Sequence, residues 1–124
     1  MATDIRVIAA GEFLETTGEG TYNLARGKQL LLEIASSNPP SGGIGVLIDV
    51  RGTPYSLTLA DISTLAVEFT RLQIGAGHRV AVLIEPERYD DAQFFTVSAR
   101  SMGNHTQAFT SFEEANDWLA QPGS

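Results

Sequence analysis

Cysteine is absent from this chain of 124 residues, which excludes disulfides, thiolate metal sites and cysteine nucleophiles. Histidine is scarce, with two residues, and no HExxH, P-loop, GxGxxG or GxSxG spacing occurs. We therefore expect no metal, no cofactor and no catalytic residues, and we interpret the chain as a non-enzyme. A chain without cysteine suits a reducing compartment, so we predict a cytoplasmic location.

Positive charge is also scarce. Eight Lys and Arg stand against fifteen Asp and Glu, giving a formal net charge of −7. Nucleic acids and anionic membrane surfaces attract a basic footprint, so neither is an expected partner. No stretch reaches the roughly 18 apolar residues that cross a bilayer, and Asp4 lies where a signal peptide would carry positive charge. We expect no membrane insertion.

Apolar residues make up 43 % of the chain and charged residues 19 %, as in an ordinary soluble globule. The length predicts one domain over residues 1–124, with 121–124 as a disordered tail.

The most informative stretch of the chain starts with the apolar run 46–48, which is typical of a strand buried on both faces. Thr58 and Asp61 then have the spacing of a capping box that begins an amphipathic helix.

The same patterns predict the order β-β-α-β-α-β-α-β-α and an α/β fold, with a single mixed, mostly parallel sheet flanked by about four helices. A hairpin turn at 10–12 is expected to join the first two strands, and Gly75 to Gly77 to end the second helix. The expected strands are 5–9, 13–17, 46–48, 79–84 and 105–109; the expected helices are about 22–35, 58–72, 90–102 and 111–119.

Polar side chains follow two of the predicted parallel strands, in the loops 49–56 and 85–90. Ligands of open α/β sheets lie beyond the carboxyl ends of the strands, so these loops form the candidate ligand-binding or docking edge. The alternative is that Asp49 and Arg51 are strand-end residues that pair with each other. The candidate residues are Asp49, Arg51, Thr53, Tyr55, Ser56, Arg88 and Tyr89.

Both histidines, His78 and His105, precede strands and so belong to the opposite edge of the predicted sheet. Neither is expected within the roughly 3 Å that a general base needs to reach Asp49 or Ser56. The acidic residues that follow the second buried strand are interpreted as a solvated edge, with an acidic docking patch as the alternative. They are Glu85, Glu87, Asp90 and Asp91.

Three parts of the chain form a recognisable pattern together with this order of elements: VLIDVRGT with SLTLADI (46–53 and 56–62), RVAVLIE (79–85) and AFTSFEEANDWLAQ (108–121). On these motifs the chain resembles the STAS-like families, which include bacterial anti-sigma-factor antagonists and related lipid-binding-like proteins. The resemblance covers nearly the whole chain, and its motifs are structural. It implies a mixed sheet flanked by helices, a non-enzymatic regulatory role and contacts with other proteins.

In the regulatory branch of that family, a partner kinase phosphorylates a Ser or Thr in a D-S-G type motif after the middle strand. A phosphate there adds roughly −2 charge where the partner binds. This chain has GTPYS at 52–56 instead, so Ser56, Thr53 or Thr58 would take the phosphate only by analogy.

Two functions therefore stay open. The first is a bacterial cytoplasmic module that docks to a partner protein or forms a homodimer, with Phe94 and Val97 at the interface. The second is a module that binds a small molecule or lipid in a cleft at the carboxyl ends of the parallel strands. A pocket of roughly 300 Å³ or more beside those ends favours the second, and exposed apolar patches favour the first.

Overall fold

The protein is represented by a computed structural model that describes residues 5–12, 21–36, 45–75 and 79–121. Within these ranges the sheet contains four strands in the order β1-β2-β3-β4. They are β1 (Ile5–Ala9), β2 (Gly45–Asp49), β3 (Val80–Leu83) and β4 (Thr106–Phe109). Every pairing among these four strands is parallel, with Val46 opposite Val80 and Asp49 opposite Leu83.

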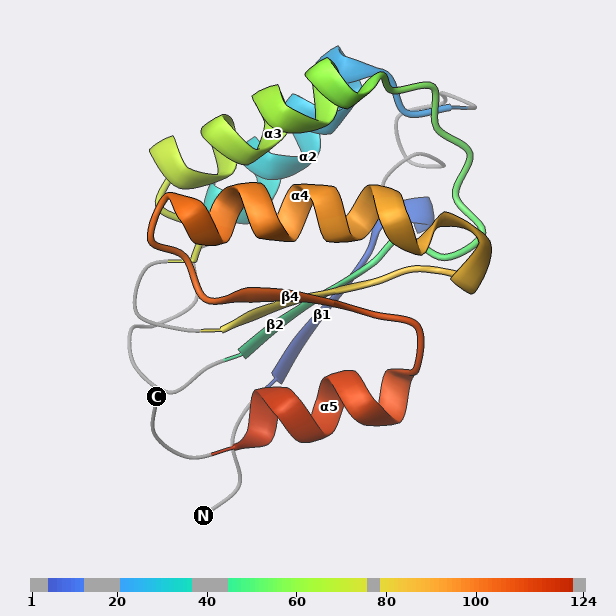
Figure 1. Ribbon diagram of the computed structural model, residues 1–124. Coiled ribbons are helices and arrows are strands. Elements are labelled where there is room, and N and C mark those ends of the chain that lie inside the picture. Colours follow the sequence, from blue (N-terminus) through green and yellow to red (C-terminus); the bar gives the residue numbers. More distant parts are fainter. Residues whose placement is uncertain (1–4, 13–20, 37–44, 76–78, 122–124) are drawn as a thin grey trace.

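Four longer helices cover the sheet: α2 (Leu24–Ser36), α3 (Leu59–Arg71), α4 (Tyr89–Ser101) and α5 (Phe112–Ala120). Figure 1 shows α2, α3 and α4 side by side over one face of the sheet and α5 on the other face. Each strand is added beside the previous one in the same direction across the sheet. Because connections between parallel strands are right-handed, the three helices that connect these strands lie on the same face of the sheet.

The apolar run that marked β2 in the sequence is buried on both faces. Val46 and Ile48 pack with the buried residues of α2 and α3, whereas Leu47 packs with Ala115 and Leu119 of α5. Successive side chains of a strand point to opposite faces, so burial of every apolar position requires a helical layer on each side. The α5 face and the α2–α4 face supply those two layers.

The predicted α/β class and the mostly parallel sheet with about four helices are confirmed. The predicted strand over 13–17 lies outside the described residues. The predicted hairpin turn is wrong, because residues 10–12 are helical. The Tyr22 hydroxyl donates a 2.9 Å hydrogen bond to the backbone carbonyl of Ala10, a fully buried residue, and so helps to hold this helical segment in place.

Helix starts are predicted with mixed success. Thr58 and Asp61 form the reciprocal capping box of α3, with side-chain to backbone distances of 3.0 and 3.1 Å. Ser111 caps α5 by accepting the Glu114 amide at 3.3 Å. α4 begins at Tyr89, within one residue of the expected start, but it has no side-chain cap; a 3₁₀ turn over Pro86–Arg88 leads directly into it.

The end of α3 also differs from the prediction. The left-handed residue is Gln73, with φ of 59°, and not one of the glycines that follow it. The amide of Gln73 donates to the carbonyl of Thr70, and the amide of Ile74 donates to that of Phe69. These two bonds form a Schellman motif, which normally favours glycine at the position of Gln73. The hydrogen-bond pattern, and not the residue preference, sets where the helix ends.

In the core, Phe69 is fully buried and meets Phe95 edge to face, with ring centroids 5.5 Å apart.

Several other apolar side chains remain at the surface. Phe112 of α5 is 40 % exposed. Phe94 and Val97 are exposed, as predicted for the outer flank of α4. Within the described ranges, no helix is long and apolar enough to cross a membrane.

Candidate functional site

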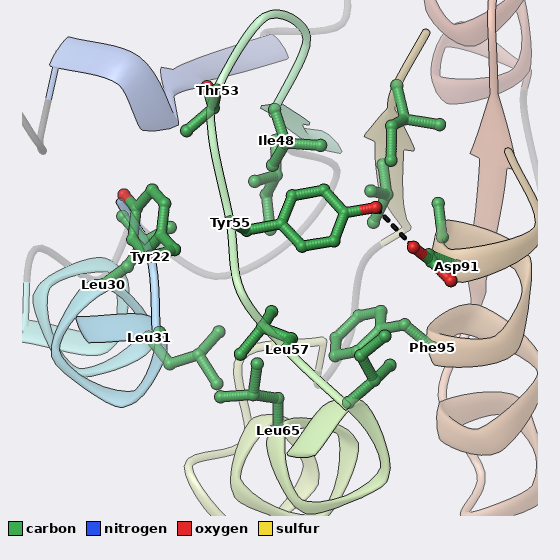
Figure 2. A pocket seen from close by; sticks show the side chains of 16 residues that line it. Tyr22, Leu30, Leu31, Ile48, Thr53, Tyr55, Leu57, Leu65, Asp91 and Phe95 are labelled. Atoms are coloured by element: carbon green, nitrogen blue, oxygen red, sulfur yellow. Dashed lines mark hydrogen bonds between the residues drawn. The ribbon is translucent and has the colours of Figure 1, made fainter. Parts of the chain in front are cut away.

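A cavity of about 140 Å³ lies between the α2–α4 layer and the carboxyl ends of β2 and β3. Its wall is almost entirely apolar, with Asp91 and three hydroxyl-bearing residues as the polar members. Figure 2 shows the side chains around it. They are Tyr22, Gly27, Leu30, Leu31, Ile48, Val50, Thr53, Tyr55, Leu57, Ile62, Leu65, Val82, Ile84, Asp91, Ala92 and Phe95.

One wall of the cavity depends on a close approach of two helices. A Cβ atom at Gly27 of α2 would lie 3.0 Å from both terminal carbons of Leu65 on α3. The absence of a side chain at Gly27 therefore lets α2 and α3 come together around Leu65. The close contact at Gly27 is thus between two helices.

The β2–α3 loop, residues 50–58, forms the roof of the cavity. On one side it pairs with Tyr22, in an isolated parallel bridge between Tyr22 and Tyr55. The amide of Tyr22 donates to the carbonyl of Pro54 at 2.9 Å, and the amide of Ser56 donates to the carbonyl of Tyr22 at 2.7 Å. These backbone bonds attach the roof to the residues that precede α2.

On its other side, the loop is attached to the segment between β3 and α4. Arg88 donates from Nη1 to the carbonyl of Thr53 at 3.0 Å. The amide of Gly52 donates to Oε2 of Glu85 at 3.1 Å, and its φ of 68° is in the left-handed region that glycine favours. The second oxygen of Glu85, Oε1, is buried and has no hydrogen-bond partner among the described residues.

Tyr55 projects from the loop across the cavity toward α4 (Figure 2). Its hydroxyl donates a short hydrogen bond to Oδ2 of Asp91, and the guanidinium carbon of Arg88 lies 4.7 Å from its ring centroid. Burial raises the pKa of Tyr55 to about 12, and Asp91 adds to the shift through its hydrogen bond and its charge. The phenol is therefore protonated near neutral pH and acts as a donor.

The strand-end alternative is correct for Asp49 and Arg51. The Nε and Nη2 atoms of Arg51 each donate to a different carboxylate oxygen of Asp49 at 3.0 Å. The hydrogen bonds to Asp49 raise the pKa of Arg51. This pair is on the surface, outside the cavity lining, and such exposed pairs contribute little to stability.

The remaining predicted site residues divide between cavity and surface. Thr53 and Tyr55 line the cavity, and Arg88 binds its roof. Tyr89 packs beside the cluster of Val82, Ile84, Ala92 and Ala108. Ser56 is exposed, and its amide is in the bridge to Tyr22.

The sequence interpretation missed Tyr22 and Asp91 as members of this site. Asp91 was assigned to a solvated acidic edge, yet it is only partly exposed and accepts the Tyr55 hydroxyl. The available signal was its position in the first turn of a helix that follows a parallel strand, at the edge where ligands bind. Tyr22 gave no comparable signal, because its backbone pairs with Tyr55, a residue 33 positions away in the sequence.

The three predicted phosphorylation sites differ in accessibility. Thr53 is 3 % exposed, and the Thr58 hydroxyl accepts a hydrogen bond in the α3 capping box. Ser56 is exposed. Of the histidines, His78 lies outside the described residues, and His105 directly precedes β4 at the edge of the sheet opposite the cavity roof. In the described part of the chain, no group of three or more His, Asp and Glu side chains is placed to hold a metal ion.

Comparisons with known proteins add no family to this geometry: no protein-family model, curated protein or solved structure gives a significant match. The resemblance to STAS-like families thus stays a prediction from the sequence.

Proposed function

We propose that this protein is a non-catalytic binding module that holds a compact apolar molecule in the cavity beneath the β2–α3 loop. The observation that carries the proposal is an apolar cavity at the carboxyl edge of the parallel strands, roofed by a loop fastened on both sides. This edge is where ligands bind in open α/β sheets.

The cavity volume sets the size of the ligand. About 140 Å³ is below the roughly 300 Å³ expected for a drug-sized ligand or a whole lipid. It is close to the roughly 150 Å³ of an engineered apolar cavity that binds benzene or xenon. A single aromatic ring or a short aliphatic body therefore matches the space, whereas a long acyl chain does not.

The lining favours binding over catalysis. The ionisable residues that line the cavity are Tyr22, Tyr55 and Asp91. Burial raises the pKa of both Tyr22 and Tyr55 to about 12, so neither phenol is a nucleophile or a base near neutral pH. Their hydroxyls make structural hydrogen bonds: that of Tyr55 ties the roof to Asp91, and that of Tyr22 donates to the carbonyl of Ala10.

Toluene is the first probe for this proposal. Titrated into the protein, it is expected to shift the amide NMR signals of cavity residues and to raise the melting temperature, because a ligand that binds the folded state stabilises it. Ala92→Leu places three extra carbons at the cavity wall and is expected to abolish both effects. Ala25→Leu adds the same carbons at an exposed position of α2 and should leave both unchanged.

A second variant guards against poor folding of Ala92→Leu. Gly27→Ala places a methyl group in the cavity wall, 3.0 Å from the end of Leu65, which also lines the cavity and has to shift. It is expected to weaken toluene binding. The proposal is wrong if toluene produces no shifts in the wild-type protein, or if the filled variants respond to toluene as the wild type does.

We propose as a second candidate that the protein is a bacterial cytoplasmic interaction module of STAS-like type. The observation in its favour is the exposure of apolar side chains on α3 and α4: Val67 is 49 % exposed, Phe94 37 % and Val97 47 %. Phosphorylation at Ser56, the exposed hydroxyl of the loop, would be the regulatory step in this case.

Self-association is the simplest test of that surface. If two copies dock through α4, sedimentation equilibrium at high micromolar concentration gives a dimer, and Phe94→Asp gives a monomer with an unchanged circular dichroism spectrum. Glu113→Asp, at an exposed position of α5, serves as the control. If the wild-type protein is a monomer under these conditions, the homodimer proposal is wrong.

A further inference from the structure

The cavity has a polar corner whose charge selects among apolar ligands. Asp91 is the charged residue of the lining, and its Oδ2 atom accepts the hydroxyl of Tyr55. The remainder of the wall is apolar or carries hydroxyl groups. A ligand that fills the cavity and extends one polar group toward this corner would meet a carboxylate.

Two further charges lie near this corner, and they act in opposite directions. Glu85 acts on the Tyr55 hydroxyl in the same direction as Asp91, whereas Arg88 opposes them. The Oε1 atom of Glu85 is buried without a hydrogen-bond partner among the described residues. Neither of these two residues lines the cavity, so the carboxylate that a bound ligand would meet is that of Asp91, which favours a hydrogen-bond donor and most of all a cation.

The cation in contact with Tyr55 is Arg88, and it is already engaged. Its Nη1 atom donates to the carbonyl of Thr53, and its guanidinium stacks on the face of the Tyr55 ring. Arg88 does not line the cavity. Because no Lys or Arg is among the described residues that line the cavity, an anionic headgroup would meet the Asp91 carboxylate with only hydroxyl groups to offset it.

We infer that the ligand is a compact primary amine with an aromatic or short aliphatic body. Its ammonium group pairs with the Asp91 carboxylate in place of the Tyr55 hydroxyl, while its body occupies the cavity. This inference rests on the proposed function, since it names the chemical class for the same site. It excludes fatty acids and other carboxylates, which would place like charges together at Asp91.

Three molecules with the same ring and different charge test the inference: benzylamine, toluene and benzoate. Followed by amide NMR titration of the full chain, benzylamine is expected to bind about tenfold or more tightly than toluene, because a charge-assisted hydrogen bond is added. Benzoate is expected to show no saturable binding.

Variants of neighbouring acids identify the group responsible. Asp91→Asn keeps an acceptor for Tyr55 but removes the charge, so the ratio of benzylamine affinity to toluene affinity should fall to about one. Asp90→Asn alters an exposed acid on the same helical turn and should leave the preference for benzylamine intact. Tyr55→Phe frees the carboxylate from the competing hydroxyl and should strengthen benzylamine binding.

The outcomes separate this inference from the proposed function. If toluene binds and benzylamine binds no better, or if benzoate binds best, the amine assignment is overturned and the apolar cavity site stands. The assignment is also overturned if Asp91→Asn leaves the preference for benzylamine unchanged. If none of the three molecules binds, the proposed function fails and the inference fails with it.

Discussion

Replacing Phe69 by alanine is expected to lower the free energy of unfolding by about 3–5 kcal/mol. Phe69 is the largest fully buried side chain, and its ring packs edge to face on Phe95, a residue of the cavity wall. The substitution removes the ring from the core and leaves a second void beside the existing cavity. Few other single truncations in this chain remove as much buried apolar surface.

Urea denaturation measures this effect, and Phe112→Ala is the matched control. Phe112 is also a helical phenylalanine but is 40 % exposed, so its truncation is expected to cost about 1 kcal/mol or less. Similar losses for the two variants would contradict the packing described for α3 against the sheet and α4.

Raising the pH from 10 to 12 is expected to destabilise the protein steeply through its buried phenols. The pKa of Tyr22 is raised from 10.0 to about 12, because its burial disfavours the phenolate. A raised folded-state pKa contributes stability that is complete below pH 10 and is lost as the pH approaches 12. For a shift of this size the loss at Tyr22 is about 2–3 kcal/mol, at roughly 1.4 kcal/mol per pH unit.

Tyr55 has the same direction of shift and adds to the loss, by a smaller amount because its side chain is only partly buried. The measurement is the unfolding free energy at intervals between pH 9 and 12 in the wild type, Tyr22→Phe and Tyr55→Phe. Each phenylalanine variant is expected to have a shallower decline. The chain has a single lysine, Lys28, and three tyrosines, so few other groups titrate in this window.

Much of the architecture follows from patterns that are local in the sequence. The apolar run 46–48 identified a strand covered on both faces, and Thr58 with Asp61 identified the start of α3. Both signals involve residues within four positions of one another, and their physics does not depend on the rest of the fold. The same holds for Ser111 at the start of α5.

Local patterns failed where competing hydrogen bonds decided the geometry. Gly75 was the expected end of α3, but the Schellman bonds place Gln73 in the left-handed conformation. The start of α4 was expected near residue 90, but the sequence patterns did not indicate the 3₁₀ turn at Pro86–Arg88 that leads directly into the helix. Residue preference is a weak guide when a neighbouring turn can satisfy the same backbone groups.

The edge of the sheet that carries the candidate site was predictable, but the set of residues that line the site was not. Thr53 and Tyr55 were expected there because loops after parallel strands share one edge. Whether those side chains meet water, each other or a cavity depends on contacts between distant segments. Asp49 and Arg51 turned out to pair with each other, and Tyr55 turned out to meet Asp91, 36 positions away.

By itself, the sequence determined the class of the fold, the burial of β2 and β3, and the caps that begin α3 and α5. Tertiary structure alone decided that α2 and α3 approach at Gly27, that Tyr22 bridges to Tyr55, and that a cavity stays open between them. The physical reason is range. Periodicity and capping act between residues a few positions apart, whereas a cavity is the space left over when helices and strands from the whole chain have packed.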